Sequence, residues 1–229
     1  MLSSCGRIPG TDRRTGTWLE ELAAPYYVFR DAGALVDLAS VAGGRAPLDP
    51  TSEEAPFQTE ATRQFKADPK AQRLLADTVK LAAIRPDPYD AVFYSGGLGP
   101  VFDLCEEGTS ISLIETMHRA GKPVAAVCHG PAVLLNTRDP QGLSLVRGRA
   151  VTGFSNSEER AANGPGVLPF SIEDEMRRLG GRYSAAADGQ PHIVADGALI
   201  TGQNPASSAG TARKVLEIIS PAVREIRPR

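Results

Sequence analysis

The 229-residue sequence has few cysteines, few histidines and few aromatic residues, and its charges nearly cancel. Its three cysteines, Cys5, Cys105 and Cys128, form no closely spaced disulfide framework and no CxxC pair for zinc or dithiol redox chemistry. The 25 basic and 27 acidic residues give a net charge of −2, so neither nucleic acid nor a membrane surface is an expected partner. Three scattered histidines and no carboxylate motif at ligand spacing lead us to predict no metal and no cofactor.

Long apolar runs are also missing from the sequence. No stretch approaches the about 18 apolar residues of a membrane span, and the N-terminus lacks the charged-then-apolar pattern of a signal peptide. We therefore expect a soluble protein of the reducing cytoplasm. Hydrophobic residues make up 41% of the chain, enough for a substantial core, and the length favours a single domain over residues 1–229.

What the sequence does contain is an alternation of strand and helix patterns. Short apolar stretches predict strands at 34–40, 90–97, 122–127, 148–154 and 192–202, the last with a turn signal at Asp196–Gly197 that fits a hairpin. Helical spacing predicts helices at 16–33, 59–83 with a break near Pro69, 110–121, 131–138, 169–181 and 205–220. Residues 41–56 are rich in glycine and proline and predict a loop. This alternation predicts an α/β fold, with a mostly parallel sheet and helices on both faces.

The stretch AVCHG, residues 126–130, places Cys128 between a predicted strand and a predicted helix. Ala126 and Gly130 are small, as a tight strand–helix turn requires, and such a nucleophile elbow lifts its side chain above the sheet. Ligands bind at this carboxyl edge of parallel sheets, and the start of the following helix favours a thiolate. The alternative is a buried structural cysteine, which is our interpretation of Cys105.

A second glycine cluster, SGGLG at 95–99, follows another predicted strand and should lie at the same sheet edge. We predict that the backbone N–H groups of Gly97, Leu98 and Gly99, together with that of His129, bind a developing oxyanion or the substrate. Such a glycine turn is usually only a tight loop, so the prediction depends on its position beside Cys128.

Six motifs occur in a fixed order along the chain: RRTGTWLEELAAPYYVFRDAGALVDLAS, YDAVFYSGGLGPVFDL, AVCHGPAVLLN, RAVTGFSNSEE, PFSIEDEMRRLGGRY and LITGQNPASSAGTARKVLE. Together they resemble the PfpI superfamily, which is related to class I glutamine amidotransferase domains. The branch of stress chaperones and glutathione-independent glyoxalases (glyoxalase III) is the most similar. The resemblance covers nearly the whole chain and implies a flavodoxin-like, doubly wound fold and a homodimer.

The resemblance also assigns site residues, motif by motif. The family's nucleophile falls on Cys128 and its companion histidine on His129. An acidic partner of the cysteine lies five residues after a Thr-Gly pair, at Glu21, which by itself would be an ordinary helix-face charge. A third member lies five residues after the phenylalanine of the TGF motif, at Glu159, with Glu158 as its competitor one residue away.

The activity implied by the resemblance is conversion of methylglyoxal-type 2-oxoaldehydes to 2-hydroxy acids such as D-lactate, without glutathione. A thiolate attacks the aldehyde carbon to give a hemithioacetal, and His129 or Glu21 moves the protons. Protein deglycase activity is a related expectation. The alternatives are a stress-related holding chaperone and a glutamine amidotransferase-like hydrolase. The amidotransferase needs a separate H-x-E arrangement, and the late HIVADG segment has Val194 at the acidic position.

Two features depart from the family pattern. Leu98 stands where relatives often carry a histidine inside the glycine turn, which leads us to expect an altered substrate preference or rate. The chain also starts at Met1, so most of the first strand of the family fold is expected to be absent, and we expect the natural start to lie upstream. That strand is central in a flavodoxin-like sheet, and leaving its neighbours unpaired is costly.

Overall fold

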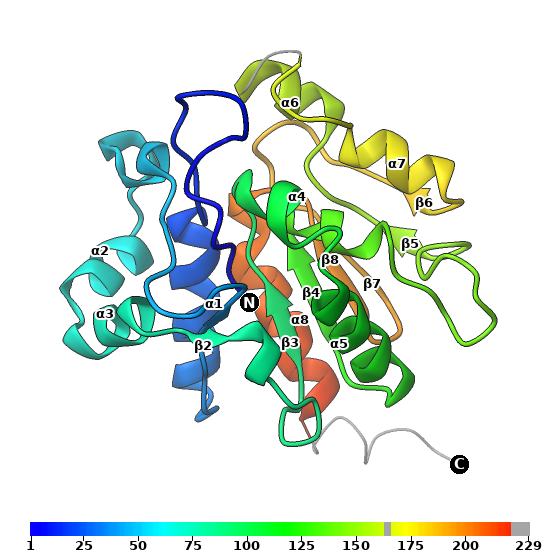
Figure 1. Ribbon diagram of the computed structural model, residues 1–229, viewed down its shortest axis with the longest axis horizontal. Helices are drawn as coiled ribbons and strands as arrows, with labels where there is room; N and C mark the ends of the chain where they lie inside the picture. The colour runs from blue at the N-terminus through cyan, green and yellow to red at the C-terminus, as the bar shows by residue number, and fades with distance from the viewer. Residues whose placement is uncertain (163–165, 221–229) are drawn as a thin grey trace.

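Figure 1 shows the computed structural model, which describes residues 1–162 and 166–220. Its strands form three hydrogen-bonded groups. The central group has four strands in the order β3 (Val92–Tyr94), β4 (Val124–Val127), β8 (Leu199–Gly202) and β7 (Ile193–Asp196). The other two groups are pairs: β1 (Ala39–Ser40) with β2 (Val79–Lys80), and β5 (Ala150–Val151) with β6 (Arg182–Tyr183). Every pair is parallel except β7 with β8. The predicted α/β fold with a mostly parallel sheet is confirmed.

The first residues of the chain connect β1 to β3. The amino group of Met1 donates to the Phe93 carbonyl at 2.6 Å, and the Ser95 N–H donates to the Met1 carbonyl at 3.2 Å. On the other side, the Leu2 N–H donates to the Ala39 carbonyl at 2.8 Å. Met1–Leu2 therefore lies between β1 and β3 and hydrogen-bonds to residues on both sides.

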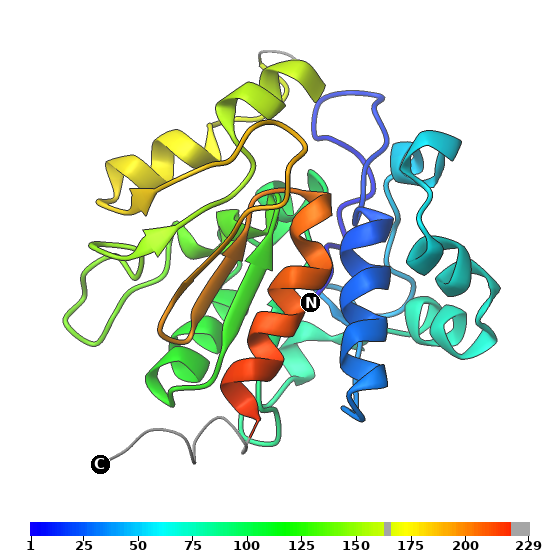
Figure 2. The ribbon, with the colours of Figure 1, turned by 180° about the vertical axis from the view of Figure 1, so that it is seen from behind.

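Helices cover both faces of the sheet. Figure 2 shows α1 (Leu19–Asp31) and α8 (Ser208–Ile219) side by side on one face. Figure 1 shows α4 (Gly99–Asp103) and α5 (Gly108–Arg119) on the other face. Helices α2 (Glu60–Ala67) and α3 (Pro69–Ala76) flank α1. Helices α6 (Asn156–Ala162) and α7 (Ile172–Arg178) lie beyond the carboxyl ends of β4 and β8 (Figure 1). Short 3-10 turns span Pro50–Glu53, Ala55–Phe57, Leu81–Ala83, Gly130–Leu134 and Pro205–Ser207.

Several boundaries follow from local chemistry. The predicted break near Pro69 is real, because the Asp68 side chain accepts the N–H groups of Lys70 and Ala71 and so caps α3. Proline at the first helical position needs no N–H partner. The predicted hairpin is also confirmed, with Gly197 in the left-handed region at φ 61° between β7 and β8.

Other boundaries were wrong. The predicted strands at 34–40, 90–97 and 148–154 shorten to two or three paired residues, because a strand extends only as far as its neighbour offers a partner. The last part of the predicted helix 59–83 is instead β2, which pairs with β1. The predicted helix 131–138 is a 3-10 turn, since the Thr137 N–H and hydroxyl both donate to the Leu134 carbonyl and end it. Helices α4 and α6 were not predicted.

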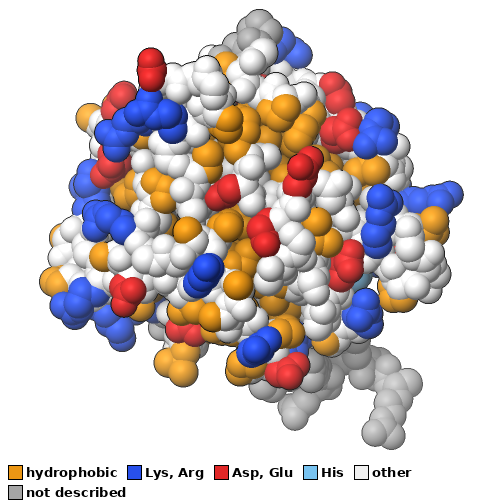
Figure 3. Space-filling view, viewed as in Figure 1, with side chains coloured by type: hydrophobic (Ala, Val, Ile, Leu, Met, Phe, Trp, Pro, Cys, Tyr) orange, Lys and Arg blue, Asp and Glu red, His pale blue; other side chains and the backbone are white. Residues whose placement is uncertain are grey.

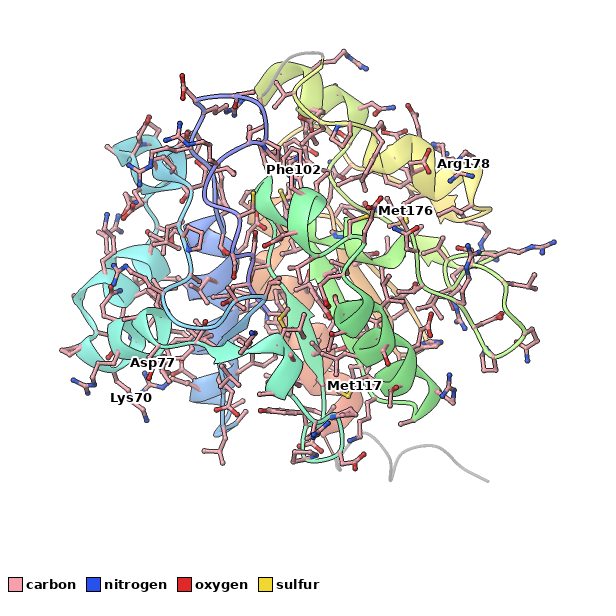
Figure 4. The ribbon with its side chains drawn as sticks, viewed as in Figure 1. Lys70, Asp77, Phe102, Met117, Met176 and Arg178 are labelled. Carbon is pink, nitrogen blue, oxygen red and sulfur yellow. The ribbon has the colours of Figure 1, made fainter. Side chains whose placement is uncertain are left out.

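The main core fills the space between the sheet and the layer that contains α5 and α7. Figure 4 labels Met117 on α5 and Met176 on α7, and both side chains are fully enclosed in this core. A second core joins α1 to α2 and α3, where the rings of Tyr26 and Phe65 meet edge to face at 5.5 Å. The sheet edge that carries Cys128 is thus supported from below by packed side chains.

The surface carries both signs of charge. On the face shown in Figure 3, basic and acidic side chains are interspersed and apolar patches lie between them. Within the described residues, no helix is long and apolar enough to cross a membrane.

Candidate active site

Cys128 occupies the sharp turn at the end of β4. Its φ of 61° makes it the one non-glycine residue in the left-handed region among residues 1–162 and 166–220. Its N–H donates to the Gly202 carbonyl at 2.9 Å, and its carbonyl accepts the N–H of Phe154 at 2.8 Å. A strained conformation of this kind costs about 1–3 kcal/mol and persists because both backbone groups are held by neighbouring segments. The turn therefore has the conformation of a nucleophile elbow.

Small residues around the turn are a steric requirement. A Cβ atom added at Gly96 would lie 2.6 Å from Glu21 Oε2 and 2.7 Å from the Val127 carbonyl oxygen. One added at Gly130 would lie 2.7 Å from the Tyr94 carbonyl oxygen. The ends of β3 and β4 can approach this closely only because glycine stands at both positions.

His129 connects the thiol to a carboxylate. Its Nδ1 lies 3.3 Å from Cys128 Sγ, and its Nε2 lies 2.7 Å from Glu159 Oε2. Since a carboxylate accepts hydrogen bonds, the Nε2 atom carries a proton, and in the neutral imidazole Nδ1 is then an acceptor that faces the thiol. The ring also packs on Phe154, with centroids 4.4 Å apart. Although His129 follows Cys128 directly in sequence, the two side chains are in contact.

Glu21 approaches Cys128 from helix α1 and is fully buried. Its Oε2 accepts the Gly96 N–H at 2.7 Å. Its Oε1 has no hydrogen-bond partner among the described residues, and the Glu21 carboxyl interacts with the Cys128 thiol. Burial raises the pKa of Glu21 to about 8, so the carboxyl keeps its proton at neutral pH.

The surroundings of Cys128 also disfavour the ionised form of its thiol. Burial first, and then the charge of Glu21, raise the pKa of the Cys128 thiol well above its ordinary value, while the N–H groups of Gly97 and His129 act in the opposite direction. We expected the helix that follows Cys128 to favour the thiolate. That segment is a five-residue 3-10 turn, and the effect of burial is larger. The thiol therefore needs a base, and His129 Nδ1 is in contact with it.

The structure separates the two candidate acids on α6. Glu159 contacts His129, whereas the Glu158 carboxylate accepts hydrogen bonds from Gln203 Nε2 at 2.9 Å and Asn204 Nδ2 at 2.8 Å. The structure thus brings Cys128, His129, Glu21 and Glu159 together, and the catalytic roles assigned to them from the sequence remain predictions.

The predicted oxyanion site is assembled in part. The N–H groups of Gly97 and His129 point toward Cys128 Sγ. Leu98 is the N-cap residue of α4 and Gly99 is its first residue, and the Leu98 side chain is buried. Their part in binding remains a prediction.

Sequence reasoning missed three contributors to the site: Phe154 against His129, and Gln203 and Asn204 around Glu158. Gln203 and Asn204 directly follow β8, at the same carboxyl edge of the sheet as Cys128. Their position after a predicted strand is the sequence signal that could have identified them. No cluster of three or more metal-ligating side chains occurs within 1–162 and 166–220.

Comparison with known proteins agrees with this geometry. The DJ-1/PfpI family profile matches residues 15–218. The chain belongs to the DJ-1/PfpI family. The expected resemblance to the PfpI superfamily is thereby confirmed.

Individual known proteins resemble the chain over most of its length. It is 28% identical to a glutathione-independent glyoxalase of Saccharomyces cerevisiae over 213 residues, which cover 90% of each chain. The crystal structure of glyoxalase III from Candida albicans superposes with a TM-score of 0.86 at 29% identity, covering 95% of this chain and 94% of that one. The Rapid Encystment Protein of Francisella tularensis superposes with a TM-score of 0.89 at 31% identity, covering 95% and 96%.

Proposed function

We propose that this chain is a glutathione-independent glyoxalase that converts methylglyoxal and related 2-oxoaldehydes to 2-hydroxy acids. The observation that carries the proposal is the contact of Cys128 Sγ with His129 Nδ1 at 3.3 Å, opposite a buried Glu21 that keeps its proton. The names of the yeast relative and of the Candida structure support the same activity. The proposed enzyme uses no cofactor.

The first step makes the nucleophile. His129 Nδ1 takes the thiol proton, and Sγ attacks the aldehyde carbon of the 2-oxoaldehyde. The carbonyl π-electrons move to the aldehyde oxygen, which takes the proton back from His129 and becomes the hydroxyl of a hemithioacetal. The Glu159 carboxylate at Nε2 holds the imidazole ring and stabilises its positive charge between these two transfers.

The second step moves hydrogen between adjacent carbons. A base, His129 or Glu21, removes the proton on the former aldehyde carbon, and the neighbouring ketone oxygen takes up a proton to give an enediol. A proton is then delivered to that neighbouring carbon while the hydroxyl on the former aldehyde carbon loses its proton, which gives a 2-hydroxy thioester. Water then attacks the thioester carbonyl, releases the 2-hydroxy acid and returns the Cys128 thiol. Methylglyoxal yields lactate, with no net oxidation or reduction.

Glu21 is suited to this exchange because its pKa lies near the working pH. In the protonated form it donates a hydrogen bond to the sulfur anion, and in the ionised form it accepts the carbon-bound proton. Glu21 and Cys128 therefore titrate as one coupled pair.

The decisive experiment follows methylglyoxal consumption without glutathione. We expect turnover by the wild type and none by Cys128→Ala. Cys105→Ala is the matched control, because it also removes a buried free thiol but lies outside the site. Absence of turnover in the wild type would exclude the glyoxalase proposal.

The other functional classes have less support. A glutamine amidotransferase mechanism calls for a second histidine near the cysteine, and the late candidate His192 contacts Ser184 instead, at 2.9 Å. A holding chaperone would work without the elbow, so Cys128→Ala should still suppress aggregation of an unfolding client. Deglycase activity on glycated thiols and amines would use the same Cys128 chemistry as the proposed reaction.

The proposal also includes the cellular location and the oligomeric state of the enzyme. Three free cysteines fit a reducing cytoplasm, and the family resemblance implies a homodimer. Sedimentation velocity tests the dimer, and fractionation of the source cells tests the location.

A further inference from the structure

Glu158 is a buried carboxylate on α6 whose hydrogen-bond partners lie on other segments of the chain. Its Oε1 accepts the N–H of Gly189 at 3.0 Å and Asn204 Nδ2 at 2.8 Å, and its Oε2 accepts Gln203 Nε2 at 2.9 Å. Burial by itself raises the pKa of Glu158, and these hydrogen bonds together bring the pKa below its ordinary value. Glu158 is therefore an ionised anchor between α6, the end of β8 and residues 186–190.

Glu158 also belongs to the cap that begins α6. The Ser155 hydroxyl oxygen accepts the Glu158 N–H at 3.1 Å, and Glu158 Oε2 accepts the Ser155 N–H at 3.3 Å, which is the reciprocal arrangement of a capping box. The preceding residue, Phe154, donates its N–H to the Cys128 carbonyl and packs its ring on His129. The first turn of α6 is thus joined directly to the elbow.

The two side-chain amides that face Glu158 cannot turn over freely. Gln203 Nε2 also donates to the Ala186 carbonyl, and Gln203 Oε1 accepts the Ala186 N–H at 2.8 Å. Asn204 Nδ2 also donates to the Gln190 carbonyl at 2.8 Å, and Asn204 Oδ1 accepts a serine hydroxyl at 3.0 Å. A flip of either amide would break these contacts, so both present an NH2 group to Glu158.

Helix α6 lacks the apolar face that usually holds a helix against a protein. Among its seven residues, all of which the structure describes, Glu158 is the one that is buried. The apolar side chains of α6 are those of Ala161 and Ala162, and both are exposed. Because no apolar stripe positions this helix, its placement depends on polar contacts, and the buried one among its side chains is Glu158.

We infer that Glu158 is a positioning residue, which holds α6 so that Glu159 meets His129. Successive side chains of an α-helix point about 100° apart, so Glu158 reaches the end of β8 while Glu159 reaches the imidazole ring. A rotation of α6 that released Glu158 would also carry Glu159 away from His129. The inference rests on the proposed function, in which Glu159 stabilises the charged form of His129.

The informative perturbation is Glu158→Gln, which keeps the shape of the side chain and replaces one acceptor oxygen by an NH2 group. Whichever way that group turns, it faces donors, for example Gln203 Nε2 and the Ser155 N–H. A donor set against a donor leaves a buried polar group unpaired. Glu158→Gln should therefore displace α6 and, with it, the Glu159 carboxylate.

The test measures how fast iodoacetamide alkylates Cys128 at pH 7, followed by mass spectrometry of the peptide that carries it. Glu159→Gln removes the charge beside His129 and should slow alkylation about tenfold, the loss expected for one charge-assisted contact. Glu158→Gln should slow it by about the same factor. The double variant should be no slower than Glu159→Gln alone, because a residue that acts through Glu159 has no effect once that contact is lost.

Two further variants complete the experiment, with Tm recorded for each. Asp68→Asn is the matched control, because Asp68 also accepts two N–H groups at the start of a helix, in this case α3; it should lower Tm and leave alkylation unchanged. Asn204→Ala removes one donor and keeps the Glu158 charge, so it replaces Glu158→Gln if that variant does not fold. It should slow alkylation about threefold.

The outcomes separate the positioning role from the proposed function. Wild-type alkylation in Glu158→Gln or in Glu159→Gln would refute the positioning role, whatever the change in Tm. A double variant about tenfold slower than Glu159→Gln would also refute it, since the two residues would then act independently. If both single variants slow alkylation as expected but the wild type does not consume methylglyoxal, the proposed function is refuted and the positioning role is supported.

Discussion

Replacing Glu21 by glutamine should change how the stability of the protein depends on pH. Glutamine has the shape of the protonated carboxyl, and its side-chain oxygen can still accept the Gly96 N–H that Glu21 accepts at 2.7 Å. What it removes is the ability to ionise inside a fully buried site. The variant therefore separates the charge of Glu21 from its packing.

The magnitude follows from the pKa. Burial raises the pKa of Glu21 from 4.5 to about 8, and each unit is worth 1.36 kcal/mol, so the shift corresponds to about 5 kcal/mol. Below pH 4.5 the carboxyl is protonated in both the folded and the unfolded chain. Between pH 4.5 and 8 the folded chain keeps a proton that the unfolded chain has lost, so the free energy of unfolding falls as pH rises. Above pH 8 the carboxyl is ionised in both states, and the free energy of unfolding has lost the full contribution of this shift.

Urea unfolding at pH 5, 7 and 9 measures this effect. Relative to wild type, Glu21→Gln should gain little at pH 5, roughly 3 kcal/mol at pH 7 and up to about 5 kcal/mol at pH 9. Glu60→Gln is the control, because Glu60 is an exposed glutamate at the start of α2. A constant difference between Glu21→Gln and wild type at all three pH values would refute the reasoning.

The same variant tests the proton role in catalysis. Glutamine can donate a hydrogen bond to the sulfur anion, but it cannot take or give a proton. We expect kcat for methylglyoxal to fall about 10²- to 10⁴-fold, with the thiol still open to alkylation. Unchanged turnover and an unchanged pH profile would show that Glu21 does not transfer the proton.

Three further variants test the packing around the site. Gly96→Ala should lose turnover and about 1–3 kcal/mol in urea unfolding, since its methyl group would lie 2.6 Å from Glu21 Oε2; wild-type values would contradict the close approach of the strands. Met176→Ala should cost about 2–5 kcal/mol in the same assay because the side chain is fully enclosed (Figure 4), and a change below 1 kcal/mol would mean that the core collapses around it. Tyr94→Phe should cost about 1 kcal/mol, because it removes the 3.0 Å hydrogen bond to Ser110, and an increase in stability would indicate that this bond is not formed.

The sequence alone determined the features that depend on neighbouring residues. Small residues on both sides of Cys128 predicted the elbow, Asp196–Gly197 predicted the hairpin, and Pro69 predicted the break between α2 and α3. Each is a matter of which backbone angles and caps a short stretch can adopt, so no distant partner is needed. The alternation of these stretches was enough for the α/β fold.

The tertiary structure decided what depends on residues far apart in the chain. Predicted strands shortened because pairing lasts only as long as the adjacent strand, which the sequence does not specify. Counting along a motif left Glu158 and Glu159 as competitors, and only the packing of α6 placed Glu159 against His129. The direction of the Cys128 pKa shift also came from burial beside Glu21, 107 positions earlier in the sequence. Desolvation depends on everything packed around a group, and for that reason the sequence located the candidate nucleophile while the fold set the direction of its pKa shift.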